Sequence, residues 1–125
     1  MNKLHDLKIW NKAIQRATDV YKVAADFPNE EKYGLTSQIK RSAVSISSNI
    51  AEGAGRNSSK EFMQFLAIAN GSSYELQTQL VITLNLKLIS SETFESLLKE
   101  IEEIQKMNYR LQESLRNKLT NNVIN

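Results

Sequence analysis

The residue types that catalyse reactions are scarce in this 125-residue chain. It has one histidine, His5, and no cysteine. A serine nucleophile needs a base beside it, and no histidine is placed to serve the serines between positions 42 and 48. The Glu-x-x-His spacing of di-iron bundles is absent, and the four glycines form no phosphate-binding loop, since no strand precedes them and no Gly-Lys-Ser or Gly-Lys-Thr follows. We expect no enzyme activity, no metal site and no bound cofactor.

The functional groups that do cluster along this sequence are those of basic residues. Positions 32–60 carry five of them against one acid, and positions 106–118 carry four against one acid. Such side chains bind phosphate by charge, and the start of the helix that follows Arg56 would add free backbone amides. The candidate nucleic-acid-binding residues are Lys40, Arg41, Arg56, Lys60, Arg110, Arg116 and Lys118.

Other interpretations of these charges stay open. They could be ordinary solvated charges or partners for acids on a neighbouring helix, and for Arg41 we favour an ion pair between subunits. The net charge of +2 is low for a dedicated nucleic-acid binder, although a ring of subunits would multiply a weak patch. Because no alternation of aromatic and basic residues is present, we expect any RNA to be bound by charge and shape, without base-specific recognition.

Asn49 and Glu52 are a second candidate group, because residues three apart share a helix face. One interpretation makes Glu52 a ligand or an acid group. The interpretation that we favour is structural: both side chains satisfy backbone groups at the corner after the helix, or bridge subunits, and Gly53 supplies a tight turn.

The elements that position these residues are helices. Apolar residues recur at intervals of three and four, which predicts helices at about 6–26, 34–54, 59–87 and 91–119. Ser58 with Glu61 forms a capping box, Pro28 stops the first helix, and Gly53 and Gly55 offer a left-handed cap to the second. The expected core seam of the first helix is Leu7, Trp10, Ile14, Ala17, Tyr21 and Ala24.

Short connections force neighbouring helices to run in opposite directions. We therefore expect an all-α, antiparallel up-down-up-down four-helix bundle. Residues 1–119 would form a single domain, and the chain would end in a short polar tail at 120–125.

Two of these helices each contain a run of small residues. In the second helix Leu35, Ile39, Ala43, Ile46 and Ile50 form the apolar stripe, yet its other faces carry Ser42, Ser45, Ser47, Ser48 and Asn49 rather than long charged side chains. We expect another helix to pack there, the alternative being a serine-rich exposed face. In the third helix the run 67–73, which contains Gly71, predicts close backbone approach, either to the second helix or to another subunit.

The run from Tyr33 to Arg56, YGLTSQIKRSAVSISSNIAEGAGR, resembles the signature of the 23S ribosomal RNA intervening-sequence proteins. The segment FLAIANGSSYELQTQL, residues 65–80, is similar to the same family's flanking pattern. The resemblance implies a four-helix bundle that assembles into a homopentamer. Its motif residues Tyr33, Gly34, Asn49, Glu52 and Gly53 would then be structural or oligomer-forming.

The resemblance also extends to accessory proteins of diversity-generating retroelements, which are basic pentamers that associate with a reverse transcriptase and its RNA. It implies a non-enzymatic, oligomeric accessory or scaffold protein with RNA or a reverse-transcriptase-like protein as its partner. The alternative is a structural or protein-interaction bundle with no affinity for nucleic acid. A cytoplasmic location fits the absence of cysteine and of any signal-peptide or membrane-spanning run.

Overall fold

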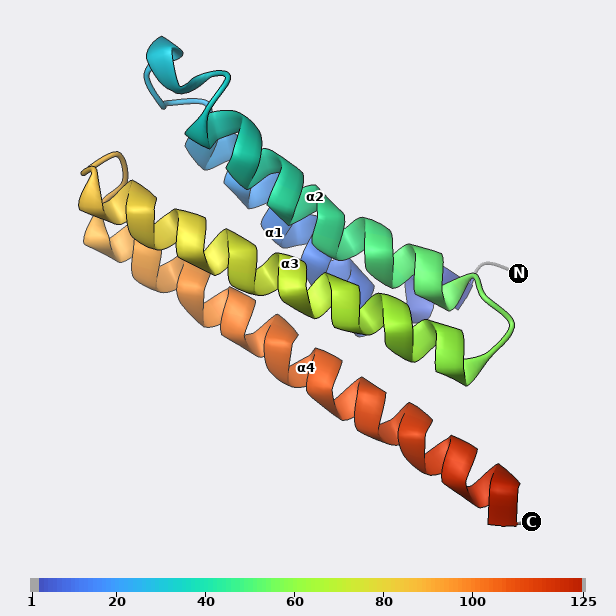
Figure 1. Cartoon of the computed structure of the whole chain (residues 1–125). Helices are drawn as coiled ribbons and strands as arrows, with labels where there is room; N and C mark the ends of the chain where they lie inside the picture. Colours follow the sequence, from blue (N-terminus) through green and yellow to red (C-terminus); the bar gives the residue numbers. More distant parts are fainter. Residues whose placement is uncertain (1–2, 125) are drawn as a thin grey trace.

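The computed structural model describes residues 3–124 and forms an antiparallel four-helix bundle (Figure 1). The helices are α1 (Lys8–Ala24), α2 (Leu35–Ala54), α3 (Ser59–Asn85) and α4 (Ser91–Ile124). Two single turns of 3-10 helix, η1 (Lys3–Asp6) and η2 (Asn29–Glu31), precede α1 and α2. The predicted fold class is confirmed. In Figure 1, α2, α3 and α4 lie in a row with α1 behind them, so that α1 packs against both α2 and α4.

The core consists of one apolar stripe from each helix. The stripe predicted for α2 is confirmed, since its isoleucines and Ala43 are buried and Leu35 packs against them. The stripes of α3 and α4 are likewise buried or packed against the core. One polar residue, Asn108, lies inside the α4 stripe and is only 2% exposed, and its amide donates to the backbone carbonyl of Leu66 at 2.9 Å. This bond ties α4 to α3.

The core face of α1 differs from the predicted seam. Its buried residues are Ile9, Ala13, Ala17, Val20 and Ala24. Ile14 and Tyr21, which were expected in the core, are 40% and 46% exposed. The difference arises because alanine lines most of the buried face, whereas the predicted seam followed the largest apolar side chains. A helix with small core residues can approach its neighbours closely.

Two helix ends also differ from expectation. None of the four glycines has a positive φ, so α2 does not end in a left-handed glycine, and Gly53 is still inside the helix. The chain does not become a non-helical tail after Leu119 either. Instead α4 continues to Ile124, since no glycine or proline stops it and Thr120 bonds back to the Arg116 carbonyl. Asn125, the last residue of the predicted tail, lies outside the described residues.

The N-cap half of the capping box predicted at the start of α3 is confirmed, whereas the Glu61 carboxylate accepts from the Ser58 hydroxyl instead of the Ser58 backbone amide. The Ser58 hydroxyl accepts the Glu61 backbone amide at 3.1 Å. At its other end, Lys87 has a φ of 61°, the left-handed conformation that usually takes glycine. The amides of Lys87 and Leu88 donate to the carbonyls of Leu84 and Thr83, which closes a Schellman motif with lysine in the glycine position.

Candidate interaction surfaces

The serine-rich face of α2 packs against α3 inside the chain. Ser42 is 1% exposed, and its hydroxyl lies 2.7 Å from a carboxylate oxygen of Glu75 and 2.9 Å from the side-chain oxygen of Gln79. One turn on, the hydroxyls of Ser45 and Ser72 are 2.9 Å apart. The expectation that a second helix covers this face is therefore confirmed, except at Ser48, which is exposed.

Gly53 belongs to the same seam, and its role differs from the predicted tight turn. A Cβ atom at this position would lie 2.7 Å from Cβ of Phe65 and 2.9 Å from Cδ1 of Phe62. These distances are shorter than carbon atoms tolerate, so only glycine lets α2 and α3 approach this closely. By contrast, a Cβ atom at Gly71 would have no neighbour within 4 Å. Gly71 therefore does not serve the α2–α3 contact.

Asn49 and Glu52 do not act as a pair. The Asn49 amide donates to the Ser45 carbonyl at 2.8 Å, within its own helix. Glu52 forms an ion pair of 2.8 Å with Arg56, whose guanidinium lies 5.0 Å from the centre of the Phe65 ring. These contacts favour the structural interpretation of Asn49 and Glu52.

The other two motif residues lie before α2. Tyr33 is 89% exposed, with the Lys32 ammonium 5.4 Å from its ring centre. Gly34 is the N-cap residue of α2, and the nearest atom to a Cβ placed there would be 3.7 Å away, so a side chain would find room. Within one chain neither residue makes a contact that demands its type.

The structure brings some of the predicted basic residues together. Arg56 from the α2–α3 loop and Lys118 from α4 line one hollow of about 480 Å³, together with Ser58, Ser59 and Phe62. Lys60, the second residue of α3, is exposed. Among residues 3–124, Lys60 and Lys118 have no acid within 4 Å, whereas Arg56 is held by Glu52 and, at 3.8 Å, by Glu61. We call Arg56, Lys60 and Lys118 the basic end.

The remaining candidates lie elsewhere. The Lys40 ammonium is 4.8 Å from the centre of the Tyr21 ring, at the contact between α1 and α2. Arg41 is exposed and makes no ion pair with the rest of residues 3–124, and Arg116 pairs with Glu113 on its own helix. The seven predicted residues therefore do not form one continuous patch on a single chain.

A hollow between α3 and α4 was missed by the sequence analysis. It has a volume of about 540 Å³ and is lined by Tyr74, Glu102, Gln105, Lys106, Tyr109 and Arg110. Of the predicted residues, only Arg110 lies here. The tyrosines are 53% and 67% exposed, unusual for large aromatic side chains. Because the residues come from two helices, no run along the sequence displays the combination.

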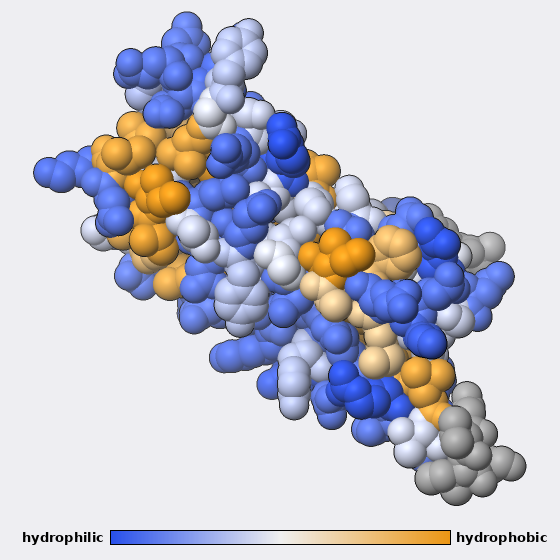
Figure 2. All heavy atoms as spheres, viewed as in Figure 1, coloured by the Kyte–Doolittle hydropathy of each residue, from blue (hydrophilic) through white to orange (hydrophobic). Residues whose placement is uncertain are grey.

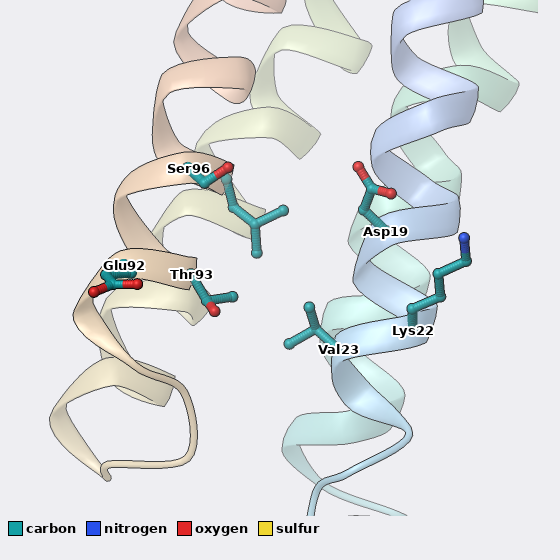
Figure 3. Close-up of a pocket in the computed structure, with 7 residues that line it drawn as sticks. Asp19, Lys22, Val23, Glu92, Thr93 and Ser96 are labelled. Atoms are coloured by element: carbon teal, nitrogen blue, oxygen red, sulfur yellow. The ribbon is translucent and has the colours of Figure 1, made fainter.

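Figure 3 shows a third hollow, between α1 and α4, of about 380 Å³. Asp19 and Val23 of α1 point across it toward Thr93 of α4, while Lys22 points away. No histidine lines it, so it offers no pairing of nucleophile and base. Next to it ion pairs join the two helices: Lys12 to Glu103 at 3.0 Å and Arg16 to Glu100 at 2.6 Å.

The outer face of α3 carries little charge. Only three of the 27 residues of α3 are charged, whereas eleven of the 34 residues of α4 are. Among its exposed residues are Ile68, Val81 and Ile82, and Gly71 lies between them. Figure 2 shows apolar patches along this side of the molecule, the largest near the end at which α3 passes into α4. We call Ala67, Ile68, Gly71, Glu75, Thr78 and Ile82 the α3 outer face, and Glu75 is its one charged member.

Residues 3–124 lack the features of two further classes of site. No group of three or more histidine, aspartate or glutamate side chains is arranged to hold a metal ion in that part of the chain. None of the helices described there has the length and apolar character of a membrane span.

The family assignment follows from the sequence and the fold together. Residues 5–110 match the family model for 23S rRNA-intervening sequence protein. The chain belongs to this family. A crystal structure of a protein of unknown function from the S23 ribosomal protein family of Bacteroides thetaiotaomicron is similar, with a TM-score of 0.78 and 27% sequence identity, over 83% of this chain and 97% of that one. No curated protein matched the chain in sequence.

The part of the chain that the family model matches contains most of the surfaces described above. It covers α1, α2 and α3 completely and α4 as far as Arg110, so the seam around Gly53, the α3 outer face and the tyrosine-lined hollow all lie inside it. Lys118 and the last turns of α4 lie beyond the part that matches 23S rRNA-intervening sequence proteins.

Proposed function

We propose that this protein is a non-enzymatic, cytoplasmic assembly protein that associates with copies of itself through the α3 outer face. The observation that carries the proposal is the composition of α3, whose apolar residues are distributed around the helix instead of being confined to its core side. A helix that is apolar all round is normally covered on all sides. Interface centres are likewise poor in charge.

The arrangement of Gly71 supports the same conclusion. Glycine inside a helix costs about 1 kcal/mol relative to alanine. Within one chain Gly71 approaches nothing, so the α2–α3 packing offers no compensation for that cost. Close approach of a second copy would compensate for the cost. We take the number of copies, five, from the homopentamer that the family resemblance implies.

The α3 outer face can be tested with two charged substitutions. Ile68→Asp with Ile82→Asp introduces two carboxylates at side chains that are 52% and 45% exposed. The double variant should keep its helical circular dichroism, and its mass measured by light scattering should be that of a single chain, 14.2 kDa. Ile14→Asp with Tyr21→Asp is the matched control, since these side chains are 40% and 46% exposed but lie on α1, and it should remain assembled. Assembly that survives the α3 variant would refute this interface.

A second part of the proposal is association with RNA, which the basic end favours. Arg56 and Lys118 are 62 positions apart in sequence, yet they line the same hollow beside the N-terminus of α3. In a ring of subunits each copy would add another such end, which strengthens attraction to phosphate. The name of the family refers to 23S rRNA, and the resemblance adds a reverse-transcriptase-like protein as a partner class.

RNA association is tested by fluorescence anisotropy with labelled RNA over a salt series. Reversing Arg56, Lys60 and Lys118 to glutamate should weaken binding about tenfold or more and reduce the salt slope by about three. The control reverses Lys22, Lys87 and Lys99, which are exposed and lie outside the basic end. Equal losses in the two triple variants would show that only total charge matters. No binding by the native protein at low salt would leave the assembly function without its RNA partner.

A further inference from the structure

The hollow between α3 and α4 combines three kinds of group around one space. It offers two tyrosine rings, Tyr74 and Tyr109, two cations, Lys106 and Arg110, and one carboxylate, Glu102. Its volume of about 540 Å³ is within the range of small-molecule sites. Neither cation forms an ion pair within 4 Å with any residue between 3 and 124.

One wall of the hollow is held in place by hydrogen bonds. The Gln105 amide donates to the side-chain oxygen of Gln77 at 3.0 Å and to the Ser73 hydroxyl at 3.2 Å. Ser73 in turn donates to the Asn70 carbonyl at 2.6 Å. The two Gln105 bonds cross from α4 to α3, so the two helices keep a fixed spacing where the tyrosines project from them. The site is therefore built on rigid elements, which suits ligand binding.

Each group in the hollow matches one part of a nucleotide. Exposed aromatic rings stack on the faces of bases. Lysine and arginine attract the phosphate, and arginine binds it with two parallel hydrogen bonds. A carboxylate only accepts hydrogen bonds, so beside a base it prefers an edge that presents donors.

The carboxylate distinguishes among the bases. Guanine presents two adjacent donors, N1–H and the amino group, which match the two oxygens of Glu102. Uracil places one N–H between two carbonyl oxygens, which repel a carboxylate. Adenine and cytosine present one donor next to a ring nitrogen that accepts. A site in which Glu102 accepts hydrogen bonds from the edge of the base should therefore favour guanine.

We propose that this hollow binds an unpaired guanosine of single-stranded RNA, with the base on the tyrosine rings, its donor edge toward Glu102 and its phosphate near Lys106 and Arg110. The inference rests on the proposed RNA association and adds base recognition to it, which differs from the expectation drawn from the sequence, because the two tyrosines come from different helices. Binding at the basic end depends on charge, whereas binding here depends on aromatic faces and one carboxylate. The two sites can be disabled separately.

The test measures anisotropy of two short labelled RNAs of equal length, one all-uridine and one with a single guanosine among uridines. The native protein should bind the guanosine strand more tightly. Tyr109→Leu and Tyr74→Leu should each weaken that binding about fivefold or more. Glu102→Gln should remove the preference between the strands without weakening the all-uridine strand. Tyr21→Leu is the matched control and should behave as native, because Tyr21 is 46% exposed but lies on α1, outside the lining of this hollow.

Each outcome has a distinct meaning. All variants must first show native circular dichroism and the native mass in light scattering, which separates loss of a base contact from loss of assembly. If the tyrosine variants bind like the native protein while reversal at the basic end weakens binding, the guanosine site is refuted and RNA association stands. If the native protein binds neither strand at low salt, both proposals fail.

Discussion

Gly53 shows how an absent side chain sets the distance between two helices. Gly53→Ala should lower the free energy of unfolding by about 1–3 kcal/mol, because the added methyl group would overlap Phe62 and Phe65. The change would otherwise be favourable by about 1 kcal/mol, as alanine is the better helix former. Urea denaturation followed by circular dichroism measures the difference.

Gly55→Ala is the control for this prediction. Gly55 caps the same helix with a φ of −79°, and a methyl group there would lie 3.5 Å from its nearest neighbour, an ordinary contact. Its unfolding midpoint should stay near the native value. Equal effects of the two substitutions would mean that the glycines act through chain flexibility rather than through packing.

Lys87 presents the opposite case, a side chain where glycine would fit better. Left-handed backbone costs a residue with a Cβ atom about 1–2 kcal/mol. Lys87→Gly should therefore raise the free energy of unfolding by about 0.5–1 kcal/mol, once the greater freedom of glycine in the unfolded chain is included. The same urea experiment measures it, and a lower midpoint would mean that the lysine side chain contributes contacts that offset its backbone strain.

Sequence reasoning succeeded at those residues whose neighbours are local. The Ser58–Glu61 cap depends on four consecutive residues, and its sequence pattern was sufficient to predict it. Gly53 was recognised as special but was assigned a turn, because its true contacts, Phe62 and Phe65, come from another helix. Asn108 was missed although it continues the α4 stripe, since an asparagine among apolar positions gives no sign of which carbonyl it binds.

At the scale of the elements, α1 and α4 are joined by charge as well as by apolar contact. The hydrogen bond and the positive charge of Lys12 lower the pKa of Glu103 below its ordinary value of 4.5. A carboxylate whose pKa is lowered by folding stabilises the folded state above its unfolded pKa. That contribution is lost as the pH falls through the folded pKa.

Lys12→Met removes the partner of Glu103 and tests this linkage. The melting temperature of the variant should lie below that of the native protein at neutral pH, and the gap should close as the pH is lowered past the range of the Glu103 pKa. Lys99→Met is the control, since Lys99 lowers the pKa of Glu103 less than Lys12 does and makes no ion pair to α1. A gap that is constant with pH would mean that Lys12 acts by packing alone.

Periodicity predicted the helices well but not every helix face. In α2 the apolar stripe is strong and its orientation was predicted correctly, whereas in α1 the buried face is largely alanine and the larger residues misled the assignment. In α3 apolar residues occur on several sides, so no single stripe explains the helix. Sequence periodicity cannot separate a face covered by the same chain from one covered by another copy.

At the scale of the whole molecule, the proposed assembly connects the other features. It would cover the α3 outer face and bring together basic ends that are individually weak, since the chain has a net charge of only +2. The single chain separates Lys40 and Arg41, which lie in the first half of α2, from the basic end beyond the other end of that helix. A many-copy particle is the arrangement in which such scattered charge can act together on one RNA.

The mass of the native protein in solution tests the central claim most directly. Light scattering across a dilution series should give a mass about five times the chain mass of 14.2 kDa, with dissociation only at the lowest concentrations. A mass of 14.2 kDa at every concentration would contradict the account, because the α3 outer face would then be exposed to solvent in the working form of the protein.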